Sequence, residues 1–406
     1  MPYSTIEAKH ISELCTVVDC EHKTALYVDK SEYLVVRTSN VKNGQLLFND
    51  MRFTTKEGYN EWTKRAIPEF GDVLFTREAP AGESCLVPHD KKVCMGQRMV
   101  MLRPKKEVTD PTFLSYILNT ERTKADILRL SIGSTVSRIN IADIKKLKVA
   151  SPPLPEQRKI AKILSTWDKA ISTTERLIDN SKQQKKALMQ QLLTGKKRLL
   201  DDSGKAFEGE WQLVHLEEAC SVNPKKSAKP VDGLVSFVPM DAVSEDSKLI
   251  RNEVKLYDEV SKGFTSFMNQ DCLVAKITPC FENGKGAYVD NLRNGLGFGS
   301  TEFHVLRARE GNCTKFIYYI TQTREFRVRG EMNMQGSAGQ RRVTTDYLKL
   351  FKVNIPPTLA EQQKVASVLD NADKEIELLE QQLSDLKQEK KALMQQLLTG
   401  KRRVTL

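Results

Sequence analysis

A segment near the middle of the chain returns unchanged at its end. Lys185–Lys196, with the sequence Lys-Lys-Ala-Leu-Met-Gln-Gln-Leu-Leu-Thr-Gly-Lys, is repeated residue for residue as Lys390–Lys401. The offset of 205 residues is about half of the 406-residue chain, and it holds without a gap back to Glu156-Gln157 and Glu361-Gln362. A repeat of this length predicts a duplicated chain, in which two globular blocks are each followed by the same type of helix.

Both copies of the repeat have the features of one long helix. Residues 156–195 and 361–400 contain no proline, and no glycine before the last residue of each segment. Prolines precede both segments, and Thr358-x-x-Glu361 has the pattern of a capping box. A glycine is typical of a helix end because it adopts the left-handed conformation easily. We therefore expect each helix to begin just after the prolines and to end at its glycine.

Apolar residues in both predicted helices alternate in steps of four and three, the spacing of a coiled coil. Such a stripe needs a partner, because a single amphipathic helix is marginal in water. Residues 361–389 carry eight acidic and three basic side chains, whereas residues 156–184 carry four acidic and six basic. Opposite charge favours pairing of the two copies within one chain, while pairing with another subunit stays open. The predicted seam is Ile160, Leu164, Trp167, Ile171, Ile178, Leu188, Leu192, Val365, Leu369, Ile376, Leu379, Leu383, Leu386, Leu393 and Leu397.

The rest of the chain has a mixed pattern that predicts an α+β fold class. We expect two globular α/β domains joined by the two long helices in a pseudo-twofold repeat. Short apolar runs predict strands, and two further segments predict matching helices. The strands are expected at 33–36, 72–75, 99–102, 234–238, 271–274 and 303–306, and the helices at 113–118 and 316–320. The predicted parts are domain 1 (1–150), the first long helix (151–198), a linker (199–210), domain 2 (211–355) and the second long helix (356–406).

The composition favours a soluble protein with an anionic partner. Hydrophobic residues make up 40% of the chain and charged residues 28%, and no apolar run reaches the ~20 residues that span a bilayer. The start lacks the basic and apolar segments of an export signal, so the expected location is the cytoplasm. A net charge of +11 favours nucleic acid, although residues 151–200 alone supply +7 of it.

The sequence contains no recognisable catalytic motif. Neither a Gly-x-x-x-x-Gly-Lys-Ser/Thr phosphate loop nor His-Glu-x-x-His is present. The glycine-rich Gly295–Gly299 lacks the spacing of a nucleotide-binding loop, and a loop between strands is expected there. Cys15, Cys20 and His22 come nearest to a zinc site, but buried reduced thiols are the preferred interpretation. We expect a non-catalytic chain with no metal or cofactor of its own.

Two kinds of segment are candidates for contact with DNA. Ser131–Arg138 and Gln335–Arg342 combine glycine, which lets a backbone approach a ligand, with Ser, Gln and Arg, which bond phosphates and base edges. Arg52–Arg65 interleaves basic and aromatic residues, and Lys276–Lys285 is its expected counterpart. Ordinary turns with solvated arginines are the alternative in each case. The candidate DNA-binding residues are Arg52, Lys64, Arg65, Arg77, Ser134, Arg138, Lys276, Asn283, Lys285, Ser337, Gln340, Arg341 and Arg342.

The ends of the repeat resemble a known family. Pro-Pro-Leu-Pro-Glu-Gln-Arg-Lys-Ile-Ala at 152–161 and Pro-Thr-Leu-Ala-Glu-Gln-Gln-Lys-Val-Ala at 357–366 resemble the repeat starts of type I restriction-modification specificity (S) subunits. Leu-Met-Gln-Gln-Leu-Leu-Thr-Gly-Lys, at 188–196 and 393–401, resembles the repeat ends.

The two globular domains, here called heads, also resemble this family, but less closely than the repeat does. Phe207–Trp211 resembles the start of the second recognition domain. Gly71–Leu74 resembles a recurrent strand motif of the family, and so does Gln270–Leu273, although Gln270 stands where glycine is usual.

The resemblance implies what the chain does. An antiparallel coiled coil would hold two target-recognition domains in opposite orientation, each reading one half of a bipartite, asymmetric DNA site and directing methylation or restriction. The implied partners are double-stranded DNA, two methyltransferase (M) subunits and restriction-translocase (R) subunits, with S-adenosylmethionine, ATP and Mg bound by the partner subunits. A coiled-coil scaffold with two protein-binding heads is the alternative, followed by a hidden nuclease. Steep loss of duplex binding with rising salt distinguishes a DNA reader from a scaffold.

Overall fold

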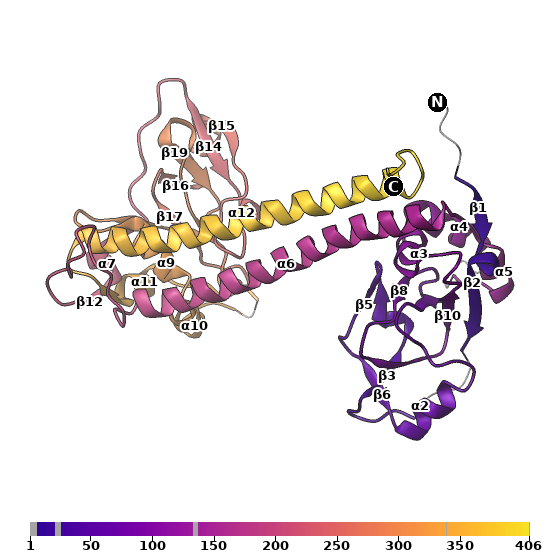
Figure 1. The fold of residues 1–406 in the computed structure, drawn as a ribbon. Helices are drawn as coiled ribbons and strands as arrows, with labels where there is room; N and C mark the ends of the chain where they lie inside the picture. Colours follow the sequence, from indigo (N-terminus) through magenta and orange to yellow (C-terminus); the bar gives the residue numbers. More distant parts are fainter. Residues whose placement is uncertain (1–5, 21–25, 133–136, 338, 406) are drawn as a thin grey trace. The chain divides into compact units, whose positions relative to one another are not determined.

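The computed structural model describes residues 6–20, 26–132, 137–337 and 339–405. The chain divides into two compact units: unit 1 is Met1–Glu175 with Gln381–Leu406, and unit 2 is Arg176–Glu380. Each unit contains one α+β head and a stretch of both long helices (Figure 1). This division cuts through both long helices, whereas the predicted domains kept each helix whole. The reason is that each helix end packs into the core of a head. In the described residues, no helix is long and apolar enough to cross a membrane.

The two long helices are α6 (Leu154–Leu192) and α12 (Leu359–Leu397). Both are followed by the predicted glycines in the left-handed conformation, Gly195 at φ 71° and Gly400 at φ 75°. At the start of α12 the Thr358 hydroxyl accepts a 3.3 Å hydrogen bond from the backbone N–H of Glu361. The Glu361 carboxylate binds Arg198 and Trp211 instead of returning to the helix start. Half of the predicted capping box therefore forms, because a guanidinium is the stronger partner for a buried carboxylate.

In unit 2, the end of α6 pairs with the start of α12 in antiparallel fashion. Lys182 of α6 lies 2.7 Å from Glu380 of α12, and Lys185 lies 2.6 Å from Asp373. The residue number on α12 falls as the number on α6 rises, which defines the direction.

Unit 1 repeats these ion pairs with the roles of the helices exchanged. Lys387 of α12 lies 2.8 Å from Glu175 of α6, and Lys390 lies 2.5 Å from Asp168. Each of these residues stands 205 positions from its counterpart in unit 2. Pairing of the two helices within the chain is thus confirmed. The lysines of the ion pairs belong to α6 in unit 2 and to α12 in unit 1. The composition alone had suggested a basic α6 against an acidic α12.

Every predicted seam residue is buried or half-buried. Ile160, Leu164 and Leu369 are 0% exposed, whereas the off-seam Leu378 is 72% exposed. The spacing of four and three therefore marks the covered stripe of both helices.

Head 1 comprises the following elements. Its strands are β1 (Ala8–His10), β2 (Cys15–Asp19), β3 (Tyr33–Val36), β4 (Val41–Lys42), β5 (Gln45–Leu46), β6 (Arg52–Thr54), β7 (Val73–Thr76), β8 (Ser84–Leu86), β9 (Lys92–Met95), β10 (Met99–Pro104) and β11 (Lys148–Ala150). Its helices are α1 (Ile11–Leu14), α2 (Lys56–Trp62), α3 (Pro111–Leu118), α4 (Glu121–Leu130) and α5 (Ile141–Lys146), with a 3-10 turn η1 (Thr38–Asn40).

Head 2 comprises a closely similar series. Its strands are β12 (Gln212–His215), β13 (Cys220–Val222), β14 (Leu234–Val238), β15 (Glu253–Leu256), β16 (Thr265–Met268), β17 (Cys272–Ala275), β18 (Gly286–Tyr288), β19 (Leu296–Gly299), β20 (Phe303–Ala308) and β21 (Lys352–Ile355). Its helices are α7 (Leu216–Ala219), α8 (Tyr257–Val260), α9 (Thr314–Thr321), α10 (Arg324–Met332) and α11 (Thr345–Leu350), with 3-10 turns η2 (Met240–Ala242) and η3 (Arg293–Gly295).

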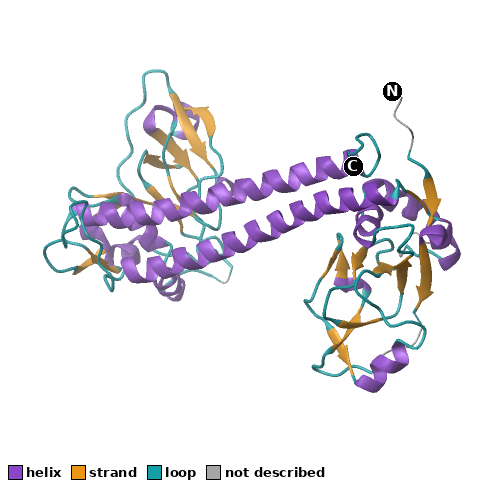
Figure 2. Ribbon diagram, in the orientation of Figure 1, coloured by secondary structure: helices purple, strands orange, loops and turns teal. Residues whose placement is uncertain are grey.

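The two heads share their topology (Figure 2). The sheet β2-β10-β7-β8 of head 1 corresponds to β13-β20-β17-β18 of head 2, and the sheet β6-β3-β9 corresponds to β15-β14-β19. In both heads the pair β3–β9 or β14–β19 is parallel while its neighbours are antiparallel. Head 2 adds β16 beside β19. All the predicted strands and short helices appear within a few residues of their expected positions.

The strand motif at Gly71–Leu74 and Gln270–Leu273 has a structural reason in both heads. Gly71 and Gln270 both adopt the left-handed conformation, at φ 96° and 68°. The aspartate that follows each accepts a backbone hydrogen bond from three residues earlier and pairs with an arginine on the neighbouring strand. Asp72 binds Arg103, and Asp271 binds Arg307. Gln270 therefore makes the same turn as glycine, at the strain cost of a side chain at positive φ.

The expectation of a loop at Gly295–Gly299 is wrong, because Leu296–Gly299 is strand β19 in the middle of a sheet. A Cβ at Gly297 would lie 2.2 Å from the ring of Phe267, and one at Gly299 would lie 2.3 Å from the Val238 carbonyl oxygen. These glycines permit close packing, and the density of glycine obscured the strand pattern.

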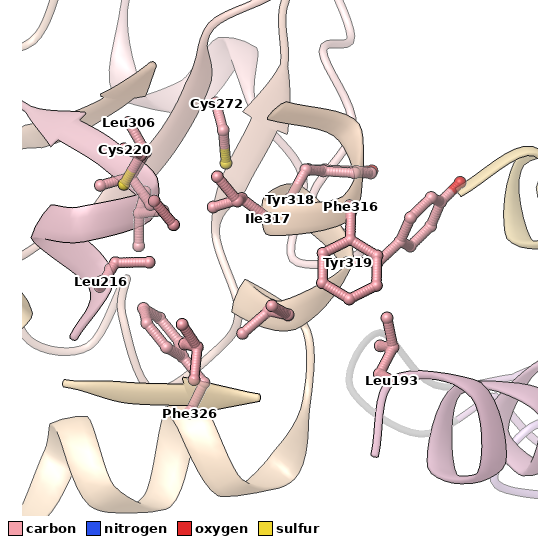
Figure 3. Close-up of a cluster of buried hydrophobic side chains, with 14 of the residues drawn as sticks. Leu193, Leu216, Cys220, Cys272, Leu306, Phe316, Ile317, Tyr318, Tyr319 and Phe326 are labelled. Atoms are coloured by element: carbon pink, nitrogen blue, oxygen red, sulfur yellow. The ribbon is translucent and has the colours of Figure 1, made fainter. Parts of the chain in front are cut away.

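The ends of the long helices belong to the head cores. In unit 2, Leu192 and Leu193 join the cluster that contains Phe316 and Phe326, and Figure 3 shows Leu193 beside the side chains of α9. In unit 1, Leu397 and Leu398 pack with the core residues of head 1. Six of the eight cysteines are buried and all eight are free thiols. The sequence analysis had predicted buried reduced thiols.

Candidate nucleic-acid interface

In head 2, two of the predicted segments form one surface. Gln335 and Arg342 exchange backbone hydrogen bonds of 2.9 and 2.8 Å, which closes a hairpin. The Thr278 N–H donates to the Arg341 carbonyl at 3.0 Å, and the Val343 N–H donates to the Lys276 carbonyl at 2.8 Å. The hairpin thus lies against the turn after β17.

The arginines of this hairpin face carboxylates of the same head. Arg342 donates two bonds to Glu302, from Nε at 3.0 Å and from Nη2 at 2.9 Å. These bonds hold the pKa of Glu302 below its ordinary value. Arg341 lies 3.9 Å from Glu282. The carboxylates orient the guanidinium groups, which reduces the conformational freedom that an anionic ligand would have to restrict.

The other predicted residues of head 2 lie on this hairpin or on the turn after β17. Ser337 and Gln340 are exposed at its tip. Asn283 is also exposed and donates to Glu245 at 2.9 Å, while the half-buried Lys285 donates to the Met240 carbonyl at 3.3 Å. Lys276 is half-buried at the base. Five of the seven predicted residues of head 2 therefore lie on this hairpin or at its base, whereas the side chains of Asn283 and Lys285 contact Glu245 and Met240.

In head 1, Ile132 and Arg138 are paired in the same way as Gln335 and Arg342. Ile132 and Arg138 exchange backbone hydrogen bonds of 2.8 and 3.0 Å, and Arg138 also pairs with Glu78 as a β-bridge. The Arg138 side chain is half exposed, with its Nε 3.3 Å from the Glu78 carboxylate. The predicted contact residue Ser134 lies outside the described residues.

Arg77 does not lie on the surface. It is 4% exposed, with Nη1 3.0 Å from Asp19 and Nε 3.4 Å from the Ile139 carbonyl oxygen. A side chain held in this way stabilises the backbone at Ile139 and does not face solvent. Its place in the sequence, after an apolar strand, gave no sign of burial.

The remaining predicted residues of head 1 lie on or near β6 and α2. Arg52 is half exposed and lies 3.8 Å from Asp50, and Lys64 pairs with Glu61. Arg65 donates to the Asp19 carbonyl at 3.3 Å, so it meets the same residue as Arg77. Asp19, which sequence reasoning missed, connects the two regions.

The expected counterpart of Arg52–Arg65 in head 2 is wrong. β6 pairs with β3, and the strand that pairs with the equivalent β14 is β15. The counterpart is therefore β15 with α8. Lys276–Lys285 follows β17, so its equivalent in head 1 is the turn after β7, where Arg77 stands.

Sequence reasoning also missed the residues that attach each head to the helices. In unit 2, Asp373 of α12 accepts from the Tyr319 hydroxyl of α9 at 2.9 Å and from Lys185 at 2.6 Å. In unit 1, Asp168 of α6 accepts from the Tyr116 hydroxyl of α3 and from Lys390. Burial raises the pKa of both tyrosines, so each hydroxyl keeps its proton and donates.

A buried glutamine anchors the start of each long helix. Gln157, 0% exposed, accepts from the Asp110 N–H at 2.9 Å and donates to the Pro152 carbonyl at 2.8 Å. Gln362 accepts from the Cys313 N–H at 2.8 Å and donates to the Pro356 carbonyl at 3.2 Å.

The glutamate next to each glutamine binds the arginine that follows the end of the other helix. Glu361 accepts from Arg198 at 2.9 and 2.7 Å and from the Trp211 indole at 3.1 Å, and Glu156 accepts from Arg403 at 2.6 Å. The available signal was the identity of Glu156-Gln157 and Glu361-Gln362 at the repeat offset. We call the tyrosine–aspartate–lysine set, the glutamine and the glutamate–arginine pair of each unit its joint.

Comparison with known proteins agrees with this duplicated architecture. The family model described as type I restriction modification DNA specificity domain matches twice, over residues 3–181 and 208–388. The chain belongs to this family. Each match takes in one head and most of the long helix that follows it.

Curated relatives are similar to the chain in sequence, and a solved structure has the same fold. The chain is 36% identical over 157 residues to the EcoAI specificity subunit of Escherichia coli, which is 38% of this chain and 26% of that protein. It is 27% identical to the putative MjaX specificity subunit of Methanocaldococcus jannaschii over 93% of this chain and 88% of that protein. The chain thus spans about a quarter of the first relative and most of the second. The S subunit from M. genitalium has the same fold, with a TM-score of 0.59 at 16% identity, covering 100% of this chain and 99% of that one.

Proposed function

We propose that this chain is the DNA-specificity subunit of a type I restriction-modification enzyme. Each head reads one half of a bipartite, asymmetric DNA site. The observation that carries the proposal is the pair of equivalent joints, which attach two heads with the same topology and different surface residues. An asymmetric bipartite DNA site requires two recognition domains with different surface residues, held by the same pair of helices.

The hairpin Gln335–Arg342 of head 2 and the segment Ile132–Arg138 of head 1, whose ends are paired, are proposed to contact the DNA bases. Exposed Gln, Ser and Arg side chains at a hairpin tip are suited to base edges, and Lys276 at the base of the hairpin is suited to a phosphate. Arg52, Lys64 and Arg65 form a second proposed contact region in head 1. Arg77 is excluded from direct contact by its burial.

The chemistry belongs to partners in this proposal. Two methyltransferase subunits bind S-adenosylmethionine, and restriction-translocase subunits bind ATP and Mg, while this chain itself catalyses no step. Among the described residues no group of three or more His, Cys, Asp and Glu side chains is placed to hold a metal ion. The assembled enzyme acts on DNA in the cytoplasm.

Methylome sequencing of the host with and without this gene tests the proposal. Deletion is expected to remove one class of adenine marks that share a bipartite site with a fixed spacer. An unchanged set of marks in a host that expresses the methyltransferase subunit would contradict it.

A salt titration separates DNA recognition from a protein-binding scaffold. Duplex binding by the chain with its methyltransferase partner is expected to fall steeply as salt rises, because each phosphate contact releases a counterion. Indifference to duplex DNA at low salt would favour the scaffold.

A further inference from the structure

One partly buried arginine of head 2 binds backbone carbonyls in place of a carboxylate. Arg327 of α10 donates from Nη1 to the Phe281 carbonyl at 3.0 Å and from Nη2 to the Gly284 carbonyl at 3.1 Å. Within the described residues its guanidinium group has no carboxylate oxygen within 4.0 Å, and its buried Nε has no hydrogen-bond partner. Burial lowers the pKa of Arg327 to about 10, which leaves it charged at neutral pH. Taking an unpaired cation out of water is unfavourable, so the contacts that it makes must offset this cost.

The two carbonyls belong to a helical turn that follows β17. The N–H of Phe281 donates to the Ile277 carbonyl, and the N–H of Gly284 donates to the Phe281 carbonyl, each at 3.0 Å. A guanidinium group near the last carbonyls of such a turn interacts favourably with them. Phe281 is 0% exposed, and its ring centroid lies 5.0 Å from the guanidinium carbon. A Cβ on Gly330 of α10 would lie 2.3 Å from the same ring, so α10 packs closely on the turn.

The same turn supports Arg341 of the hairpin. The Thr278 N–H donates to the Arg341 carbonyl at 3.0 Å, and the Thr278 hydroxyl donates to the Glu282 carboxylate at 2.8 Å. The carboxylate oxygen that accepts this bond lies 3.9 Å from the Arg341 guanidinium group. Glu282 stands between the two residues whose carbonyls Arg327 binds. A continuous series of contacts therefore connects Arg327 with both the backbone and the side chain of Arg341.

Head 1 has an ion pair at the equivalent place. Lys124 is the fourth residue of α4, as Arg327 is of α10, and its Nζ lies 2.5 Å from the Glu83 carboxylate. Glu83 directly precedes β8, and the residue that directly precedes β18 is Lys285. The acid of head 1 is thus replaced by a base in head 2, so the basic residue of the helix has lost its carboxylate partner.

The change of partner accompanies a longer connection between two strands. Residues 77–83 join β7 to β8, whereas residues 276–285 join β17 to β18, which is three residues more. An ion pair at the last residue fixes only the end of a connection. Two bonds to the carbonyls of Phe281 and Gly284 fix the conformation of the turn itself.

We propose that Arg327 is a positioning residue of head 2, which fixes the turn Pro279–Gly284 and thereby orients Arg341 for contact with DNA bases. The inference rests on the proposed function, since that function makes Arg341 a DNA contact. A side chain that is oriented before binding loses less conformational freedom in the complex and discriminates better between bases. The half-site read by head 2 therefore depends on Arg327.

Arg327→Met in the full-length chain, assembled with the methyltransferase subunit, tests the proposal by competition between matched and single-mismatch duplexes. Discrimination is expected to fall at least about tenfold in the half-site that Arg341→Ala relaxes and less than about twofold in the other half-site. The matched control is Arg329→Met on the same helix, an exposed side chain that pairs with Glu325. Equal discrimination by Arg327→Met and this control would overturn the proposal.

Two further variants separate positioning from general stability. Leu216→Ala removes a side chain of α7 that is 0% exposed, and it is expected to lower thermal stability while discrimination is kept at temperatures where the chain is folded. When Arg327→Met is added to Arg341→Ala, discrimination is expected to fall by less than about twofold further, because Arg327 acts through Arg341. Loss of discrimination in Leu216→Ala as large as in Arg327→Met, or full additivity in the double variant, would overturn the proposal.

Hydrogen exchange of the full-length chain measures the turn in the absence of DNA. The amides of Phe281 and Gly284 are expected to exchange at least about tenfold faster in Arg327→Met, while those of β17 keep their wild-type rates. Unchanged exchange in the turn would contradict the role of Arg327.

The wild-type assembly keeps these tests separate from that of the proposed function. If the wild-type assembly does not discriminate between matched and mismatched duplexes, the proposed function fails. If it discriminates and Arg327→Met does so equally well, only the positioning role fails.

Discussion

Unit 1 and unit 2 use the same residues where the head meets the helices and different residues where the head meets solvent. Gln157 and Gln362 anchor equivalent helix starts, and Asp168 and Asp373 accept from equivalent tyrosines and lysines. At the surface, head 2 has an additional strand, β16, and its hairpin carries the pair Arg341–Arg342 where head 1 has Arg138. The difference teaches that duplication preserved the contacts between each head and the long helices, while the solvent-facing surfaces of the heads diverged.

The joints also differ in one detail. Glu361 binds both Arg198 and Trp211, and a Cβ on Gly195 would lie 3.1 Å from that indole. In unit 1, Ile6 takes the place of the tryptophan, 2.5 Å from a Cβ on Gly400. An aliphatic side chain fills the space but donates no hydrogen bond, so Glu156 lacks the indole partner that Glu361 has.

The largest expected effect tests whether the coiled-coil seam contributes equally to stability in unit 1 and in unit 2. Leu164→Ala and Leu369→Ala each remove a side chain that is 0% exposed at the same repeat position. Each is expected to lower the free energy of unfolding by about 2–5 kcal/mol, since a buried leucine leaves a cavity. Chemical denaturation of both variants measures this. Leu378→Ala, at a 72% exposed site, is the control and is expected to change stability by less than about 0.5 kcal/mol. If one seam variant were as stable as this control, the seam would not contribute equally to the stability of the two units.

The next effect tests the difference between the joints. Glu361→Gln weakens charge-assisted bonds to Arg198 and Trp211 and is expected to cost about 2–3 kcal/mol of stability. Glu156→Gln affects the bond to Arg403 without an indole partner, so its cost is expected to be lower by about 1 kcal/mol. Thermal unfolding of the two variants side by side measures the difference. Equal destabilisation would show that the indole bond contributes nothing.

A third prediction concerns the separate reading of half-sites. Arg341→Ala in head 2 and Arg138→Ala in head 1 are each expected to weaken DNA binding by about 1–3 kcal/mol and to relax sequence preference in one half of the site only. Binding-site selection with the assembled methyltransferase measures both. The same half-site relaxed by both variants would contradict the assignment of one half to each head.

The smallest effect is the pH response of the hairpin in head 2. Arg342 lowers the pKa of Glu302, so their pair stabilises the fold above the ordinary carboxyl pKa and this contribution is lost as pH falls through the lowered pKa. Arg342→Met is expected to return the Glu302 pKa toward its ordinary value and to remove this part of the acid sensitivity. Carboxyl NMR titration of both proteins measures the shift. An unchanged Glu302 pKa in the variant would show that Arg342 is not its cause.

The sequence by itself determined the two long helices of this protein and most of its short strands. The exact return of Lys185–Lys196 at Lys390–Lys401, the spacing of four and three, and the prolines and glycines at the helix ends predicted α6 and α12 to within a few residues. Local rules suffice there, because the period of a helix and the chemistry of its ends are written in neighbouring residues. The short strands followed from the same kind of local pattern.

Only the tertiary structure decided which polar residues act together. Tyr116, Asp168 and Lys390 come from three elements far apart in the chain, and no local pattern joins them. The burial of Arg77 and its contact with Asp19 were equally invisible, because an arginine after a strand has the same sequence whether it faces solvent or a carboxylate. Hydrogen bonds and ion pairs of this kind depend on distances that the folded chain alone sets, whereas helix period and end chemistry are properties of the chain before it folds.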